Sequence, residues 1–263
     1  MENLAEENYP REFNLIEVLS IAWNIFSKNY FKLFGFIFAI AFPMAIINTM
    51  IVKPKMTALS LQIEALKSNP PALIEFLLNW NDLQTSMLFA LVSILSLTLV
   101  AIISKAVNSI LYETEFNSSS IVMATLKHFP IVLLTALLLG LMSIVGLFFI
   151  IIPGILVYVY YYFAIISCAT ESKGIFQSLM NSYNLVKGRF LMTFVFILFF
   201  FLLGLIVSSV LSIIGQNITS QYINIMIELI SGIASTYFIV AHYVLFVNYR
   251  DTAHLYAPRI IQE

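Results

Sequence analysis

The chain has 263 residues, of which 60% are apolar and only 10% are charged, and its formal net charge is −1. Soluble domains contain about 45–50% apolar and about 25% charged residues, so a soluble fold would lack the polar side chains needed to cover its surface. The near-zero charge also excludes a global field that would attract nucleic acid. We therefore predict an all-α membrane protein, a polytopic helical bundle, with residues 1–263 forming one membrane domain.

The N-terminal segment is acidic, since residues 1–12 contain four Glu and one Arg. This is the opposite of the positively charged start of a signal peptide, and we expect a mobile cytoplasmic tail that is not cleaved. Residues 14–30 follow as a short amphipathic helix. Its apolar stripe consists of Leu15, Val18, Leu19, Ala22, Ile25 and Phe26. Such a helix is expected to lie on the inner leaflet of the membrane.

Six apolar stretches are long enough to cross a bilayer core of about 30 Å, which takes about 20 residues. They are residues 31–52, 86–106, 130–152, 154–170, 190–214 and 222–249. Residues 53–82, between the first two, predict a helical connector made of two short helices. The connector either packs as a simple link or caps the outer face of the bundle. The other outer turns are predicted at 152–154 and 215–221.

The distribution of cations predicts the orientation of the six spans. Ten of the 13 Lys and Arg residues fall on one side: Arg11, Lys28, Lys32, Lys105, Lys127, Lys173, Lys187, Arg189, Arg250 and Arg259. The other side holds Lys53, Lys55 and Lys67. Because cytoplasmic loops carry the excess of Lys and Arg, we expect both termini, including the tail at 250–263, in the cytoplasm. The expected location is the inner or plasma membrane.

A weak threefold pattern precedes spans one, three and five, at residues 14–30, 118–129 and 174–190. Each segment is amphipathic and ends with a cation and an aromatic residue just before a long apolar run. We therefore predict three cytoplasmic interfacial helices. Their candidate contacts to lipid or to a partner protein are Trp23, Lys28, Lys127, Tyr183, Lys187 and Arg189.

Short motifs add a resemblance to a known family. The motifs are the apolar Pro-Gly segment at 149–157, the acidic-glycine turn at 171–174, the serine-containing helix at 178–190 that ends in Lys-Gly-Arg, and the opening helix at 16–23. With these the chain resembles the membrane domain of bacterial glycerophosphodiester phosphodiesterases and YciC-type membrane proteins. The resemblance implies the topology and supplies no catalytic residues. Asn181 departs from the pattern, because the family more often has Arg or Lys there.

Recognisable catalytic motifs are missing from the sequence. HExxH, GxSxG, Walker A and GxGxxG patterns do not occur, and the three histidines lack the spacing of metal ligands. We therefore predict neither enzyme activity nor a cofactor or metal.

Ionisable residues inside membrane spans are functional candidates because they are costly in lipid. The candidate intramembrane site consists of Glu228, Asn224, Ser231, Ser235 and His242, all in the sixth span. Three of these residues, Asn224, Ser231 and Ser235, lie at helical spacing from Glu228. The alternative is that Glu228 and His242 make structural hydrogen bonds.

Two further patterns concern packing. Gly204, Ser208 and Ser212 recur every four residues in the fifth span, as do Ser231 and Ser235 in the sixth, and such stripes allow close helix approach. We predict that these two spans pack along the stripes. Tyr158 and residues 160–162 form a tyrosine cluster, either an interfacial belt or a groove for a hydrophobic ligand.

Two functions are compatible with these features. The first is a non-enzymatic scaffold or accessory protein that binds membrane lipid or a partner protein through its cytoplasmic helices. The alternative is a transporter or export factor for a lipid-like or small amphiphilic substrate, which Glu228 and the internal repeat favour.

Overall fold

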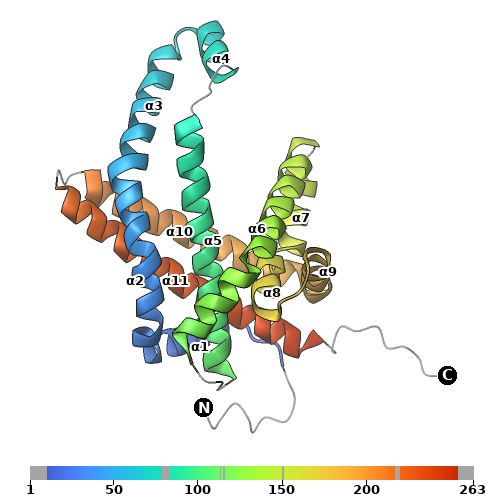
Figure 1. The fold of residues 1–263 in the computed structure, drawn as a ribbon. Coiled ribbons are helices and arrows are strands. Elements are labelled where there is room, and N and C mark those ends of the chain that lie inside the picture. The colour runs from blue at the N-terminus through green and yellow to red at the C-terminus, as the bar shows by residue number, and fades with distance from the viewer. Residues whose placement is uncertain are drawn as a thin grey trace.

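The computed structural model describes residues 11–78, 83–112, 114, 116–149, 151–216 and 220–253, and within these ranges the regular structure is helical (Figure 1). In chain order the elements are α1 (Leu15–Lys28), α2 (Tyr30–Ile47), the π-helical turn η2 (Asn48–Val52), α3 (Lys53–Leu66), α4 (Pro70–Leu78), α5 (Leu83–Leu111), α6 (Ser118–Phe149), α7 (Ile151–Tyr160), α8 (Ala164–Glu171), α9 (Ile175–Val186), α10 (Phe190–Gln216) and α11 (Gln221–Asp251).

Six helical stretches of the described chain are long and apolar enough to cross a membrane. This confirms the predicted all-α polytopic bundle and its number of spans. The bundle has two ends, which we call the Arg189 end and the Lys53 end after a residue at each. The Arg189 end holds α1, α8 and α9, and the Lys53 end leads into α3 and α4 (Figure 1).

The first span differs from its predicted limits. Instead of ending at residue 52, the helix continues from Tyr30 to Leu66 through η2, a stretch of 37 residues. At 1.5 Å per residue it is about 55 Å long, well beyond a bilayer core of about 30 Å. The two predicted connector helices exist, but α3 buries none of its residues. Together with α4 it projects away from the bundle instead of capping it (Figure 1).

The three amphipathic segments predicted from the sequence differ in structure. In α1 the predicted stripe is correct, and Val18, Ala22, Ile25 and Phe26 are buried, but the stripe packs against α11 and not against lipid. The segment at 118–129 is not a separate helix, because α6 runs through Pro130 to Phe149. Asn117 caps this helix by accepting hydrogen bonds from the backbone N–H groups of Ser119 and Ser120. Two of the three predicted short helices, α1 and α9, are therefore separate elements.

The third span ends with α6 at Phe149 and the fourth begins with α7 at Ile151, just before the turn predicted at 152–154, and the fourth span is interrupted in its middle. Pro153 and Gly154, predicted to form an outer turn, lie in the first turns of α7, where proline is tolerated. A Cβ on Gly146 of α6 would lie only 2.8 Å from the Cα of Gly154, so glycine permits the close approach of α6 and α7. The interruption is at residues 161–163, between α7 and α8.

The predicted small-residue packing of α10 against α11 is wrong. Ser208 is exposed, and a Cβ on Gly204 would meet no atom within 4 Å. The side chain of Ser212 lies outside the described part of the structure. The two helices instead meet through aromatic rings, such as Phe200 and Phe238 with centroids 5.0 Å apart.

Gly232, beside the small residues of α11, contacts α2 instead of α10, since a Cβ on Gly232 would lie 2.8 Å from the Cβ of Ala41.

Candidate functional site

A cavity of about 130 Å³ lies between α2, η2, α5 and α11. Its polar lining comes from Asn48 on η2 and from Glu228, Ser231 and Ser235 on α11. Its other lining residues are Ala41, Met44, Ala45, Leu99 and Gly232. The structure thus brings together three of the five polar residues selected from the sequence and adds Asn48, which sequence spacing could not link to α11.

Glu228 is a charged residue of this lining, and its side chain is 21% exposed. Its Oε1 lies 2.7 Å from the Nζ of Lys53, the first residue of α3, whose side chain is 49% exposed. The π-helical turn places Asn48 at the cavity and Lys53 beside Glu228. π-Helical turns occur often at functional sites because they change which side chains share a helix face. Ser235 is partly satisfied within α11, where its Oγ donates to the Gly232 carbonyl at 2.8 Å.

Asn224 and His242 do not line the cavity. Asn224 lies next to Gly215 of α10, and its Nδ2 donates to the Ser220 carbonyl at 3.4 Å. The His242 ring lies among aromatic rings, with centroids 4.8 Å from Phe200, 5.1 Å from Phe196 and 5.2 Å from Tyr162. Its Nδ1 is hydrogen-bonded to the Phe238 carbonyl one turn earlier. The five residues therefore do not form one site.

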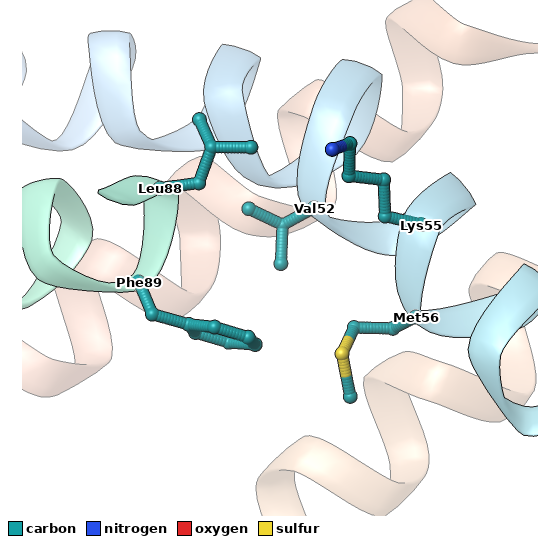
Figure 2. Close-up of a pocket in the computed structure, with 5 residues that line it drawn as sticks. All are labelled: Val52, Lys55, Met56, Leu88 and Phe89. Atoms are coloured by element: carbon teal, nitrogen blue, oxygen red, sulfur yellow. The ribbon is translucent and has the colours of Figure 1, made fainter. Parts of the chain in front are cut away.

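The projecting helices α3 and α4 form an arm (Figure 1). A second recess, which is apolar, lies along this arm between α3 and α5. Figure 2 shows its lining, with Val52, Met56 and Phe89 turned toward one another and the amine of Lys55 directed away. The recess has no room for a water-sized group. The polar cavity is therefore the better candidate for a ligand.

Arg189 is not a surface contact, although its position in the sequence suggested one. It is buried, at 4% exposure, because Gly188 with its φ of 90° turns the chain sharply between α9 and α10. Its guanidinium donates to the carbonyls of Tyr249 (2.8 Å) and Thr252 (2.7 Å) and pairs with Glu12. These carbonyls end α11, so Arg189 caps that helix.

The other predicted interfacial contacts have mixed positions. Lys28, Lys127 and Lys187 are exposed, and Trp23 is 59% exposed with its ring edge against Tyr237 at 5.8 Å. Tyr183 is half-buried against the ring of Tyr160, 5.2 Å away. The tyrosine cluster thus contributes to contacts between α7 and α9 and is not solely a belt.

The break in the fourth span is held by one side chain from α9. Ser182 Oγ accepts a hydrogen bond from the Phe163 N–H and donates one to the Tyr160 carbonyl, both at 3.0 Å. These are the backbone groups that an uninterrupted helix would satisfy internally. Sequence reasoning found the helix that contains Ser182 but not the break, because no Pro or Gly marks residues 161–163.

The sequence did not predict a polar cluster that lies at the Arg189 end. Glu171 at the end of α8 accepts hydrogen bonds from Ser167 (2.7 Å) and Asn181 (2.9 Å) and lies 2.9 Å from the Lys173 amine. Arg250 of α11 lies 3.9 Å from the same carboxylate. Asn181, the departure from the family pattern, is therefore a neutral partner for Glu171.

Arg250 extends this cluster to α5 by donating to the phenol oxygen of Tyr112, and partial burial raises the pKa of that phenol. Four helices, α5, α8, α9 and α11, meet in the cluster. The signal that could have revealed it is the set of charges at the predicted ends of the fourth and sixth spans, but the distance between them depends on the fold.

The side chains of the described residues contain no group of three or more His, Cys, Asp or Glu positioned to hold a metal ion. Comparisons of the chain with protein-family models, with curated proteins and with solved structures find no match. The resemblance to the phosphodiesterase membrane domain therefore stays a prediction.

Proposed function

We propose that the protein is a non-enzymatic membrane scaffold or accessory protein that binds membrane lipid through α1 and α9. The observation that carries the proposal is that both helices have apolar side chains on two faces. One face is buried in the bundle, and the other leaves Ile16 and Trp23 on α1 76% and 59% exposed. On α9, Phe176 and Met180 are 79% and 61% exposed.

A water-facing helix would not expose such a face, so lipid or a partner has to cover it. The exposed Lys28 and Lys187 follow these faces at the ends of α1 and α9. A lysine at such a position extends to phosphate headgroups while its stem contacts acyl chains. Anionic lipid is therefore the preferred ligand in this proposal, and the leaflet is the cytoplasmic one of a cell membrane, which the cation bias favours.

The test is retention of anionic phospholipid by the protein extracted with its surrounding lipid and analysed by native mass spectrometry. The double variant Lys28→Gln/Lys187→Gln is expected to weaken retention by about fivefold per lysine. Lys67→Gln, which changes an exposed lysine on the projecting arm, serves as the matched control. Equal retention by all three proteins, or a stoichiometric protein partner in place of lipid, would contradict lipid binding at α1 and α9.

A transporter for a small amphiphile is the second candidate, and two observations favour it. The first is the cavity with the Glu228 carboxylate, and the second is the interrupted fourth span, since broken helices and their bundle-facing backbone are common in transporters. Substrate flux into proteoliposomes that Glu228→Gln abolishes would favour this candidate. Flux that persists in Glu228→Gln would argue against it.

A further inference from the structure

We propose that the cavity between α2, η2, α5 and α11 binds the primary ammonium group of an amphiphile, and that the Lys53 amine occupies this position in the unliganded protein. This binding site goes beyond the proposed scaffold function, and it specifies the chemistry of the cavity that the transporter candidate would use. It lies toward the other end of α11 from α1 and α9, so it can be present whether or not those helices bind lipid.

The first argument is the charge of the site. Glu228 is mostly buried in a segment that has the composition of a membrane span, where an unpaired carboxylate is costly. The site therefore requires a cation, and Lys53 supplies one at 2.7 Å.

The second argument is that the two partners are not equally fixed. Glu228 belongs to α11, which packs against α2, α5 and α10, whereas Lys53 begins a helix without buried residues and its side chain is half-exposed. A long exposed side chain can return to water at small free-energy cost. The ammonium of Lys53 is therefore the exchangeable group, and another ammonium can take its place.

The third argument is hydrogen bonding. An R–NH₃⁺ group has three donors. Besides Glu228, the lining includes Asn48 and Ser231, whose side chains carry an amide and a hydroxyl group that can accept hydrogen bonds. Among the described residues the lining contains no aromatic ring, and a quaternary ammonium, which has no N–H donor, is recognised by aromatic faces. The site therefore favours a primary over a quaternary ammonium.

The fourth argument is the shape and polarity of the cavity. Its volume of about 130 Å³ gives room for several water-sized groups, which suits a short alkylammonium headgroup. The wall formed by Ala41, Met44 and Leu99 is apolar, so the carbon chain that follows the ammonium is also accommodated. A primary ammonium carried by a lipid, such as that of phosphatidylethanolamine, is the ligand that we expect.

Binding of three soluble probes to the detergent-solubilised full-length protein tests the proposal. The probes are dihexanoyl-phosphatidylethanolamine, dihexanoyl-phosphatidylcholine and free ethanolamine, titrated by native mass spectrometry. Wild type is expected to prefer the first probe. Lys53→Met removes the internal competitor and is expected to tighten its binding about three- to tenfold, whereas Lys53→Arg stays close to wild type. Glu228→Gln is expected to lose the binding.

Lys67→Met is the matched control, because Lys67 also pairs with a glutamate of α3, Glu64, at 2.5 Å, but on the exposed arm. Equal effects of Lys53→Met and Lys67→Met would overturn the proposal, as would phosphatidylcholine binding as tightly as phosphatidylethanolamine. If ethanolamine binds as tightly as the lipid and Glu228→Gln abolishes both, the ammonium site is upheld and its ligand is a small soluble amine. Unchanged melting temperatures show that each variant is folded. If Lys53→Met fails this check, loss of binding in folded Glu228→Gln upholds the site, and retained binding overturns it.

Discussion

The two ends of the bundle use their charged residues in opposite ways. At the Arg189 end, Arg189 is buried and its guanidinium caps α11. Glu171 there contacts polar side chains from α8, α9 and α11. At the Lys53 end, Glu228 lines a cavity and has a half-exposed partner. A charge surrounded by fixed partners stabilises one structure, whereas a charge beside empty volume with an exchangeable partner is suited to binding.

The largest effect is expected from Arg189. Replacing it with Met leaves the last carbonyls of α11 without their donor, and the carboxylate of Glu12, whose side chain is 35% exposed, without its partner. A hydrogen bond to a charged group contributes about 1.5–3 kcal/mol. We expect Arg189→Met to lower the melting temperature in detergent strongly, and Lys187→Met, two residues earlier and exposed, to change the free energy of unfolding by less than about 0.5 kcal/mol. Similar melting curves for both variants would contradict a capping role for Arg189.

Ser182 is expected to have the next largest effect, since it is a single hydroxyl that bridges the break between α7 and α8. Ser182→Ala leaves the Phe163 N–H and the Tyr160 carbonyl unsatisfied in a buried position, at a cost of about 1–3 kcal/mol. Ser178→Ala is the control, because this buried serine donates within its own turn, to the Gly174 carbonyl. Hydrogen exchange at residues 160–164 should rise in Ser182→Ala and not in Ser178→Ala.

Glycine substitutions test the corrected packing of α11. Gly232→Ala places a Cβ 2.8 Å from that of Ala41, and such overpacking costs about 1–3 kcal/mol. Gly204→Ala meets open space and is expected to stabilise α10 by up to about 1 kcal/mol through its higher helix propensity. The melting temperatures of both variants, measured by thermal unfolding, test these two expectations. If Gly204→Ala is the destabilising one, α10 packs through its small-residue stripe after all.

Much of this fold could be predicted from the sequence, because the number of spans follows from apolar runs and the buried stripe of α1 follows from its period. What covers that stripe could not be predicted, since lipid and α11 are equally apolar partners for Val18 and Ile25. The same limit explains the α10 error, because a row of small residues permits close packing without naming the partner. For the site, the spacing of Glu228, Ser231 and Ser235 predicts a shared helix face. Asn48 and Lys53 reach that face only through a π-helical turn, for which the sequence has no signal.

The smallest expected effect concerns the start of α1. The side chain of Asn14 accepts from the Glu17 N–H, and Glu17 accepts from the Asn14 N–H, both at 2.9 Å, forming a capping box. A hydrogen bond from Arg11, followed by the one from the Asn14 backbone, lowers the pKa of the Glu17 carboxyl from its ordinary value of 4.5. Because this pKa is lower in the folded state, the stabilisation is complete above pH 4.5 and is lost as the pH falls through the lowered pKa.

Glu17→Gln should therefore melt slightly earlier than wild type at neutral pH, and the difference in melting temperature should shrink as the pH falls below 4.5. Glu64→Gln is the matched control on α3, where the carboxylate pairs with Lys67 and caps no helix. The first turn of α1 joins the core through Leu15 and Val18, so loosening this turn should weaken the contact of α1 with α11. Equal melting temperatures of wild type and Glu17→Gln at every pH would mean that the amide of the variant forms the capping box as well as the carboxylate does, and that the ion pair with Arg11 contributes nothing to the stability of the Arg189 end.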